Sequence, residues 1–490
     1  MPILQLSLPP GMYRSGTQLQ SLGRWYDGNL VRFYAGTIQP IGGWRLKSTT
    51  AMTGAPRAII SWRDNESTTR AAIATHSHIY YMTRAGVLSD ITPAGFAAGR
   101  ADAVAAGGYG DADYGEGTYG SPRDDSTQIQ DATITSMDTW GEDLVFVSPE
   151  DTTIYQWNLD PAVRAVAVVN APSANALIVT QEGILMALGA AGVPRQVKWS
   201  DQRNNTIWTA DATNQAGDFE LQTNGRLMMG LRITGGLLLL TDLDVHLATY
   251  TADNRVYAFD KKSDGCGAIS RSAGVALDSQ AVWMGTSGFW LYNGFAQPLP
   301  CDVSDYVFSD LNYLQQSKVV CEVNSEFGEV TWRYCSGGSI EIDRYVTWNL
   351  RENHWTVGSL RRLCGTDKGV TPYPLRCGGD GQVYEHEVGF TYDADMPFLE
   401  GGPFQLSNGD NVMYASLLMP DDKTVGDVSA SFFVKFEPDG AETKYGPYNL
   451  ASRTDLRFGG RQMRVRFDGV RSIGWRIGAP RLDVTPGGMR

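Results

Sequence analysis

The stretch Gly288–Gly294, GFWLYNG, contains a short pattern that recurs along the chain: an aliphatic or aromatic residue followed by tyrosine or tryptophan, bounded by turn residues. Between about residues 50 and 390 the pattern occurs six times, at irregular intervals of about 35 to 100 residues. The six copies lie near Ile79 (SHIYYMT), Ile154 (TTIYQWN), Val256 (NRVYAFD), Trp290 (GFWLYNG), Val346 (RYVTWNL) and Val383 (GQVYEHE). A degenerate repeat of this kind is typical of stacked four-stranded sheets, and we predict that these copies are outer strands of β-propeller blades.

The rest of the chain supports an all-β fold. Its 490 residues include 55 glycines, 13 tryptophans and 22 tyrosines, an excess of turn and aromatic residues that favours strands. Short apolar runs alternate with Gly, Asn and Asp turns, without a long amphipathic helix. After Phe390 the repeat pattern is lost. We therefore predict an N-terminal extended or docking segment (1–49), a β-propeller with degenerate blades (50–390), and an additional small C-terminal β-sandwich or sheet domain (391–490).

A Gly/Tyr/Asp-rich stretch interrupts the strands at Gly107–Pro122, GGYGDADYGEGTYGSP. So many glycines oppose a rigid packed element, because each adds backbone freedom that folding must remove. Tyr109, Tyr114 and Tyr119 recur every five residues, which matches neither helix nor strand periodicity but supplies adhesive aromatic surface. We predict an extended loop whose tyrosines contact a partner. The alternative is a disordered surface insertion.

The charge of the chain is unevenly distributed. The formal net charge is −13, yet residues 451–490 hold nine arginines against three aspartates, which leaves −19 for the first 450 residues. Such an acidic body disfavours general binding to nucleic acid. In the strand QMRVRF, Arg464 and Arg466 are expected on one face, with Val465 and Phe467 on the other. The arginines predict a basic docking patch for an acidic partner, such as another copy of the chain, or simply a solvated sheet face.

The sequence offers little that indicates catalysis. It contains no P-loop, no G-x-S-x-G and no dinucleotide fingerprint. The six cysteines form no C-x-x-C pair, and His76 and His78 share a strand face without a third ligand nearby. The segment Trp199–Trp208 resembles the Asp-box of sialidase-type propellers, which is a structural hairpin, with Asn204 and Asn205 suited to its left-handed turn. We predict no catalytic residue, no metal and no cofactor.

Two further observations concern location. No apolar run approaches the length of a membrane span, and the opening MPILQLSLPPGMYR has no basic region before its short apolar run, which Pro9 and Pro10 interrupt. We expect a protein that is made in the cytoplasm and does not span a membrane.

Taken together, several segments resemble the tail hub or nozzle proteins of short-tailed bacteriophages, a group that includes the packaged-DNA stabilisation proteins. The resemblance is distributed over most of the chain. It rests on MPILQLSLPPGMYRSGTQLQSLGRWYDGNLVRF (1–33), GGYGDADYGEGTYGSPRDD (107–125), VKWSDQRNNTIWT (197–209), SAGVALDSQAVWMGTSGFWLYNG (272–294), CDVSDYVFSDLN (301–312) and WRIGAPRLDVTPGGMR (475–490).

The resemblance implies a structural, non-enzymatic protein of the virion tail, synthesised in the host cytoplasm. It implies a homohexameric ring beneath the portal and the head-to-tail adaptor proteins that extends the DNA ejection channel, retains packaged DNA and anchors tail fibres or spikes. Double-stranded DNA would pass through such a ring transiently and without sequence preference, so the acidic body predicts a lumen lined mainly by Asp and Glu. The competing hypotheses are a propeller glycosidase and a sugar-binding, receptor-recognition module.

Overall fold

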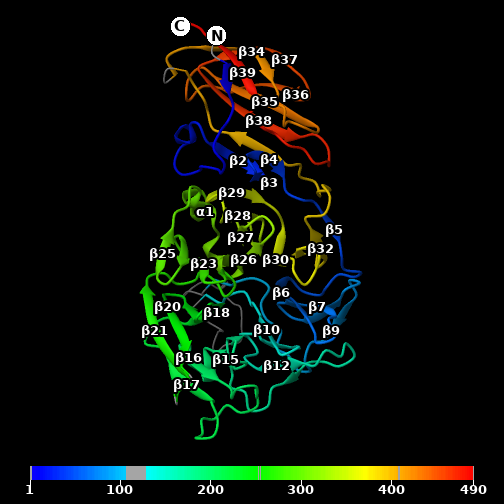
Figure 1. Ribbon diagram of the computed structural model, residues 1–490, viewed down its shortest axis with the longest axis vertical. Helices are drawn as coiled ribbons and strands as arrows, with labels where there is room; N and C mark the ends of the chain where they lie inside the picture. Colours follow the sequence, from blue (N-terminus) through cyan, green and yellow to red (C-terminus); the bar gives the residue numbers. More distant parts are fainter. Residues whose placement is uncertain (1–2, 106–128, 252, 254, 407–408, 489–490) are drawn as a thin grey trace, which may run out of the picture.

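Seven four-stranded antiparallel sheets form a closed ring of blades in the computed structural model (Figure 1), which describes residues 3–105, 129–251, 253, 255–406 and 409–488. The first strand of each blade, β6, β10, β14, β18, β22, β26 and β30, contacts the first strand of the next, and β30 contacts β6 again. The chain is therefore an all-β protein built on a seven-bladed β-propeller, and the predicted fold class is confirmed.

Each blade is an antiparallel meander. In chain order the strands of the blades are β6 (Pro56–Arg63), β7 (Thr69–Thr75), β8 (Ile79–Thr83) and β9 (Leu88–Asp90); β10 (Ser136–Trp140), β11 (Asp143–Val147), β12 (Ile154–Trp157) and β13 (Val166–Ala167); β14 (Ala176–Val179), β15 (Leu185–Leu188), β16 (Gln196–Trp199) and β17 (Gly217–Glu220); β18 (Leu227–Ile233), β19 (Gly236–Thr241), β20 (Asp244–Tyr250) and β21 (Tyr257–Asp264); β22 (Gly274–Leu277), β23 (Gln280–Met284), β24 (Phe289–Tyr292) and β25 (Ala296–Leu299); β26 (Val320–Asn324), β27 (Glu329–Tyr334), β28 (Arg344–Asn349) and β29 (His354–Ser359); β30 (Arg362–Thr366), β31 (Leu375–Gly378) and β32 (Val383–His386), which β5 (Trp44–Leu46) completes.

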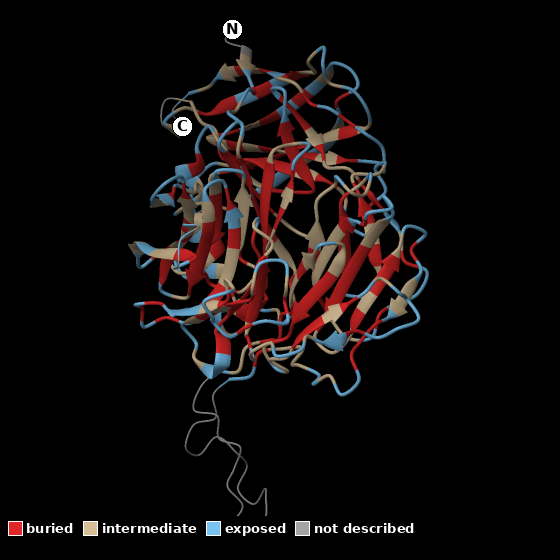
Figure 2. Ribbon diagram, turned by 60° about the horizontal axis from the view of Figure 1, so that its bottom comes forward, coloured by how far each residue is buried: buried red, intermediate tan, exposed pale blue. Residues whose placement is uncertain are grey.

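The second strand of a blade explains why short stretches of the sequence are continuously apolar. All four residues of β15, Leu185–Leu188, are buried, because neighbouring blades cover both faces of the sheet. Figure 2 shows the same distribution over the whole ring, with burial in the strands and exposure at the turns.

The recurring aromatic pattern marks a strand position in the blades, although not the one expected. The copies near Ile79, Ile154, Trp290, Val346 and Val383 form third strands, β8, β12, β24, β28 and β32. A third strand lies inside the outermost one, so the prediction of outer strands was wrong for these five. Only the copy near Val256 leads into a fourth strand, β21. The aromatic residues suit the third strand because its side chains still pack between adjacent blades.

The N-terminal segment is a structural part of both domains. Its strand β5 pairs with β32 and closes the seventh blade, while β1 (Ile3–Gln5) and β2 (Trp25–Asn29) join the C-terminal sheets. Strands β3 (Val31–Tyr34) and β4 (Thr37–Pro40) form a hairpin that lies between the propeller and the C-terminal sheets (Figure 1). The predicted extended or docking segment over 1–49 therefore needs correction, because strands β1, β2 and β5 of this segment pair with strands of the two domains.

The C-terminal residues form the two-sheet domain labelled at the top of Figure 1. One sheet has the order β1, β39 (Arg481–Pro486), β34 (Met413–Met419), β37 (Thr454–Gly460), and the other β2, β33 (Phe398–Gly401), β38 (Gln462–Gly469), β35 (Val428–Lys435), β36 (Thr443–Asn449). Alternate residues of β38 are buried between the sheets. The first strand of this domain after the propeller is β33, close to the predicted boundary at 390.

One hydrophobic core continues from the sandwich into the propeller. The same cluster includes Phe467 of β38, Trp25 of β2 and Trp355 of β29. At the junction the Met12 amide donates to the Trp355 carbonyl at 2.7 Å, and the Leu30 amide donates to the Tyr345 hydroxyl at 3.0 Å. A shared core of this kind fixes the sandwich rigidly on blade 6.

Candidate functional site

The connection between the first and second blades contains the Gly/Tyr-rich stretch. Tyr109, Tyr114 and Tyr119 lie outside the described residues, and their predicted contact with a partner stays a prediction. Both flanks are described. The Val104 amide donates to the Gln130 carbonyl at 2.9 Å, and the Gln130 amide donates back to the Val104 carbonyl at 3.0 Å. The two ends of the stretch are therefore held side by side.

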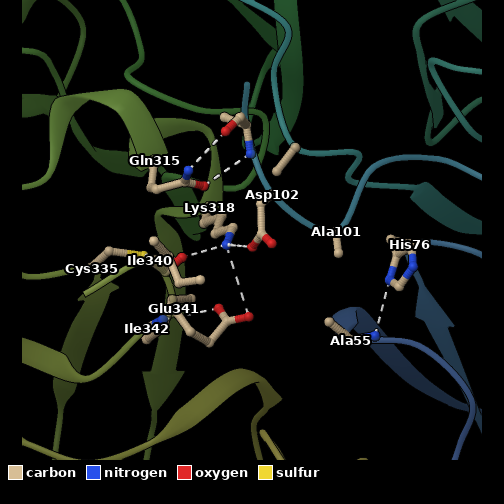
Figure 3. Close-up of polar contacts among 12 residues, drawn as sticks. Ala55, His76, Ala101, Asp102, Gln315, Lys318, Cys335, Ile340, Glu341 and Ile342 are labelled. Carbon is tan, nitrogen blue, oxygen red and sulfur yellow. Dashed lines mark hydrogen bonds and ion pairs between the residues drawn. The ribbon is translucent and has the colours of Figure 1, made fainter. Parts of the chain in front are cut away.

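A buried lysine anchors the first flank to the sixth blade (Figure 3). Lys318 ends the helix η3 (Tyr313–Lys318), which follows α1 (Ser304–Asp310) between blades 5 and 6, and its side chain is 0% exposed. The Nζ atom donates to Asp102 Oδ1 and to the Ile340 carbonyl, both at 2.5 Å, and lies 3.9 Å from Glu341 Oε2. A buried ammonium is tolerated only where such acceptors surround it.

Other side chains of η3 hold the backbone of both flanks. The amide group of Gln315 accepts from the Ala103 amide at 3.0 Å and donates to the Ala103 carbonyl at 2.9 Å (Figure 3). On the second flank, the Ala132 amide donates to Ser317 Oγ at 3.0 Å. The Gln315 side chain thus satisfies the backbone N–H and C=O groups of Ala103, as a neighbouring β-strand would.

Arginines from two further blades complete this anchor. Arg57 of β6 donates to both carboxylate oxygens of Glu341 at 2.8 Å and to the Ala101 carbonyl at 2.7 Å. Arg226, which precedes β18, pairs with Asp131 at 2.8 Å. Blades 1, 4 and 6 all contact the flanks, so the flanks cross the end of the central channel.

The central channel holds a cavity of about 290 Å³ that all seven inner strands line. Among its described lining residues are three arginines, Arg57, Arg232 and Arg271, and one carboxylate, Asp138, which Arg232 binds at 2.7 Å. Burial and the nearby Arg226 lower the pKa of Arg271 to about 10. This cavity lies within a single chain. The acidic lumen that the resemblance and the charge of the chain predict for a hexameric ring stays a prediction.

The arginine pair of the C-terminal domain lies where the sequence places it, on the face of β38 opposite Val465 and Phe467. Its charge, however, is neutralised within the sheet. Arg464 pairs with Glu400 and with Glu442 (2.5 Å), and Arg466 donates to Asp468 at 2.8 Å and lies near Glu400. Three carboxylates stand against two guanidinium groups, so the predicted basic docking patch is not formed. Residues 398–490 together hold 12 Lys and Arg against 11 Asp and Glu, because acids of 398–450 offset the basic segment.

The candidate metal and hairpin residues have structural roles. His76 Nδ1 accepts from the Ala55 amide at 3.0 Å, and burial together with Arg57 lowers the pKa of His76. Across the described ranges, no group of three or more His, Cys, Asp or Glu is placed to hold a metal.

In the hairpin that resembles an Asp-box, the residue with the left-handed backbone is Arg203, with a φ of 56°. The prediction that Asn204 and Asn205 adopt the left-handed turn was therefore wrong. Trp208 Nε1 donates to the Asn205 carbonyl at 2.7 Å and closes the turn.

Sequence reasoning missed the anchor of the flanks. Lys318 and Gln315 stand in an unremarkable stretch, YLQQSKVV, more than 200 residues from Asp102 and Ala103. Only the closure of the ring brings them together, so no local signal could have identified them.

No protein-family model matches the chain, and no curated protein matches it either. Several solved structures are similar to it at low identity. A catalytically inactive virginiamycin B lyase from Staphylococcus aureus with quinupristin is 6% identical and covers 70% of this chain and 99% of its own (TM-score 0.41). A nidogen/laminin complex is 8% identical over 50% of this chain and 86% of the matched chain (TM-score 0.31), and BBS1N in complex with ARL6DN is 10% identical over 77% and 97% (TM-score 0.30). In the described part of the chain, no helix is both long and apolar enough to cross a membrane.

Proposed function

We propose that this protein is a structural component of a short bacteriophage tail, a hub or nozzle subunit that assembles into a homohexameric ring. The ring extends the DNA ejection channel below the portal and adaptor proteins, helps to retain packaged DNA, and anchors tail fibres or spikes. The proposal rests first on the sequence resemblance, whose segments extend from residue 1 to residue 490.

The observation that carries the proposal furthest is the shared core between the two domains. The sandwich uses both ends of the chain, and its hydrophobic cluster continues into blades 5 and 6. A subunit of a conduit needs this property, because a rigid body transmits the position of one contact surface to another. The domains do not resemble a pair that opens and closes around a substrate.

The polar groups also favour a structural role. The buried carboxylates Glu322, Glu329 and Glu387 are all engaged by arginines, at 2.6, 2.8 and 2.7 Å. A glycosidase needs one carboxyl group with a raised pKa facing a second across a cleft. In the described part of the chain, burial raises the pKa of the Asp310 and Glu442 carboxyl groups, and neither lines the central cavity. We therefore prefer the structural role to the glycosidase hypothesis.

Immunogold labelling of intact particles tests this assignment. An antibody raised against the purified chain is expected to decorate the tail below the portal, and pre-incubation with the purified chain should abolish the labelling. Gold confined to the capsid, or to free protein released from infected cells, would contradict a tail component.

A further inference from the structure

A cavity of about 570 Å³ lies between the last blade and the first. Its walls come from β5 and the β30–β31 loop on one side and from the β6–β7 hairpin and the end of β8 on the other. The N-terminal strand β5, which completes the seventh blade, thus contributes to one wall of the cavity. The cavity volume falls within the range of about 300–1,000 Å³ that is usual for small-ligand sites.

The cavity is strongly basic in an acidic protein. Of the residues that the structure describes, five cations line it, Arg45, Lys47, Arg63, Arg70 and Arg84, together with one carboxylate, Glu385. Asp64 lies behind Arg70 and binds its Nε at 2.7 Å. Even with Asp64 counted, the cavity has a local charge of +3, whereas the whole chain has −13. A cavity lined by one sign of charge concentrates ligands of the opposite sign.

Three of the five cations are already partly satisfied within the fold. Glu385 accepts from Arg45 Nε at 2.7 Å and from Lys47 Nζ at 2.9 Å. Burial would raise the pKa of Glu385, but the hydrogen bonds from Lys47 and Arg45 outweigh it and lower the pKa. Because one carboxylate serves two cations here, this side of the cavity keeps an excess positive charge.

Arg63 and Arg84 have no such partner. Both are exposed, and within the part of the chain that the structure describes neither has a hydrogen bond, ion pair or ring contact to its side chain. They approach the cavity from two different hairpins of blade 1. Each guanidinium offers five N–H donors in a planar fork that matches the oxygens of a phosphate group.

We propose that this cavity, which we call the closure cleft, binds a small ligand that carries one or more phosphate groups. Arg63 and Arg84 donate to the phosphate oxygens, and Arg45 and Lys47 add charge from the opposite wall. The apolar side chains of Met82, Leu375 and Pro372 also line the cleft and suit the uncharged part of such a ligand. A phosphate fits better than a single carboxylate, because it offers more charge and more acceptor oxygens to an excess of donors.

The test is isothermal titration of the full chain with inorganic pyrophosphate at constant ionic strength. We expect saturable binding by the unchanged protein and at least a tenfold loss of affinity in the double variant Arg63→Gln/Arg84→Gln. Neither side chain has a described partner, so the double variant should keep the native unfolding midpoint. The matched control is Arg164→Gln, an exposed arginine of blade 2 without a described side-chain partner, which should bind like the unchanged protein.

A gain of affinity provides a second readout. Glu385→Gln removes the competing carboxylate and should tighten pyrophosphate binding several-fold. The proposal is overturned if the unchanged protein shows no saturable binding, if the double variant binds equally well, or if Arg164→Gln loses as much affinity. It is also overturned if a poly-glutamate peptide of equal charge binds more tightly, because the cleft would then recognise an acidic polypeptide. None of these outcomes depends on ring assembly.

Discussion

The ammonium group of Lys318 depends on acceptors from two distant parts of the chain, Asp102 and the Ile340–Glu341 turn. Removing a partner from a buried charge costs more than removing the charge itself. We expect Asp102→Asn to lower the free energy of unfolding by about 2–3 kcal/mol, and Lys318→Met, which keeps the length of the side chain, by about 1 kcal/mol. Urea unfolding of the two variants measures both values. The opposite order would show that the ion pair is not what stabilises the flank.

His354, at the start of β29, predicts a pH dependence. Its ring lies edge-on to Phe33 at 5.4 Å, and burial lowers its pKa to about 4. The unfolded chain takes up this proton near pH 6.5 and the folded chain does not, so the contribution to stability is complete above pH 6.5 and falls as the pH drops toward 4. The expected slope is about 1.4 kcal/mol per pH unit for this one group.

Unfolding curves at several pH values between 6.5 and 4 measure that slope. In His354→Gln the slope should decrease by about the same amount, because glutamine does not titrate. An unchanged slope would assign the acid sensitivity to other groups, such as His386, whose pKa burial and neighbouring arginines also lower.

At the scale of elements, we expect strand β5, which completes the seventh blade, to contribute strongly to stability. Trp44 stacks on His386 at 5.1 Å, lies 4.9 Å from the Arg362 guanidinium and donates from Nε1 to Asp393 at 2.8 Å. We expect Trp44→Ala to cost about 3–5 kcal/mol. Thermal unfolding followed by circular dichroism measures the loss.

Deletion of residues 1–49 distinguishes the two interpretations of that segment. The fold places β5 in the seventh blade and β1 and β2 in the sandwich, so the truncated chain should lack a cooperative unfolding transition. A truncated chain that unfolds cooperatively near the native midpoint would favour the original prediction of an extended or docking segment over 1–49.

The Gly/Tyr-rich stretch belongs to the same scale, because its ends are joined by the Val104–Gln130 bridge and anchored by Gln315. Deleting Tyr109–Tyr119 should therefore shift the melting temperature by no more than about 2 °C. The same deletion should impair assembly or attachment of a partner protein. Normal yields of infectious particles from the deleted chain would reduce the stretch to a spacer.

Sequence periodicity predicted the β-strands of a propeller but not which strand completes the last blade. The aromatic repeat identified a propeller, since third strands pack between blades and need large side chains. In blade 3 the third strand is β16, QVKW, which lacks the pattern, and in blade 4 the strand β20 precedes the copy that was recognised. The pairing of β5 with β32 joins residues about 340 apart, and a three-residue strand has no signal of its own.

For the whole molecule, net charge was a poor guide to local electrostatics. The basic C-terminal segment suggested a docking patch, yet Glu400 and Glu442 neutralise Arg464 within its own domain. The basic surface lies instead in the closure cleft, whose five cations are dispersed between Arg45 and Arg84 in the acidic part of the sequence. A charge sum over a segment cannot show this, because pairing depends on strand neighbours that are distant in sequence.

The central claim is that the chain is one subunit of a ring through which DNA passes. Electron cryomicroscopy of intact tails, reconstructed without imposed symmetry, tests it most directly. We predict six copies of the seven-bladed propeller with its rigidly attached sandwich, around a bore lined mainly by Asp and Glu, with the arginines of 451–490 away from the DNA path. A single copy in each tail, or a bore lined by those arginines, would contradict the account.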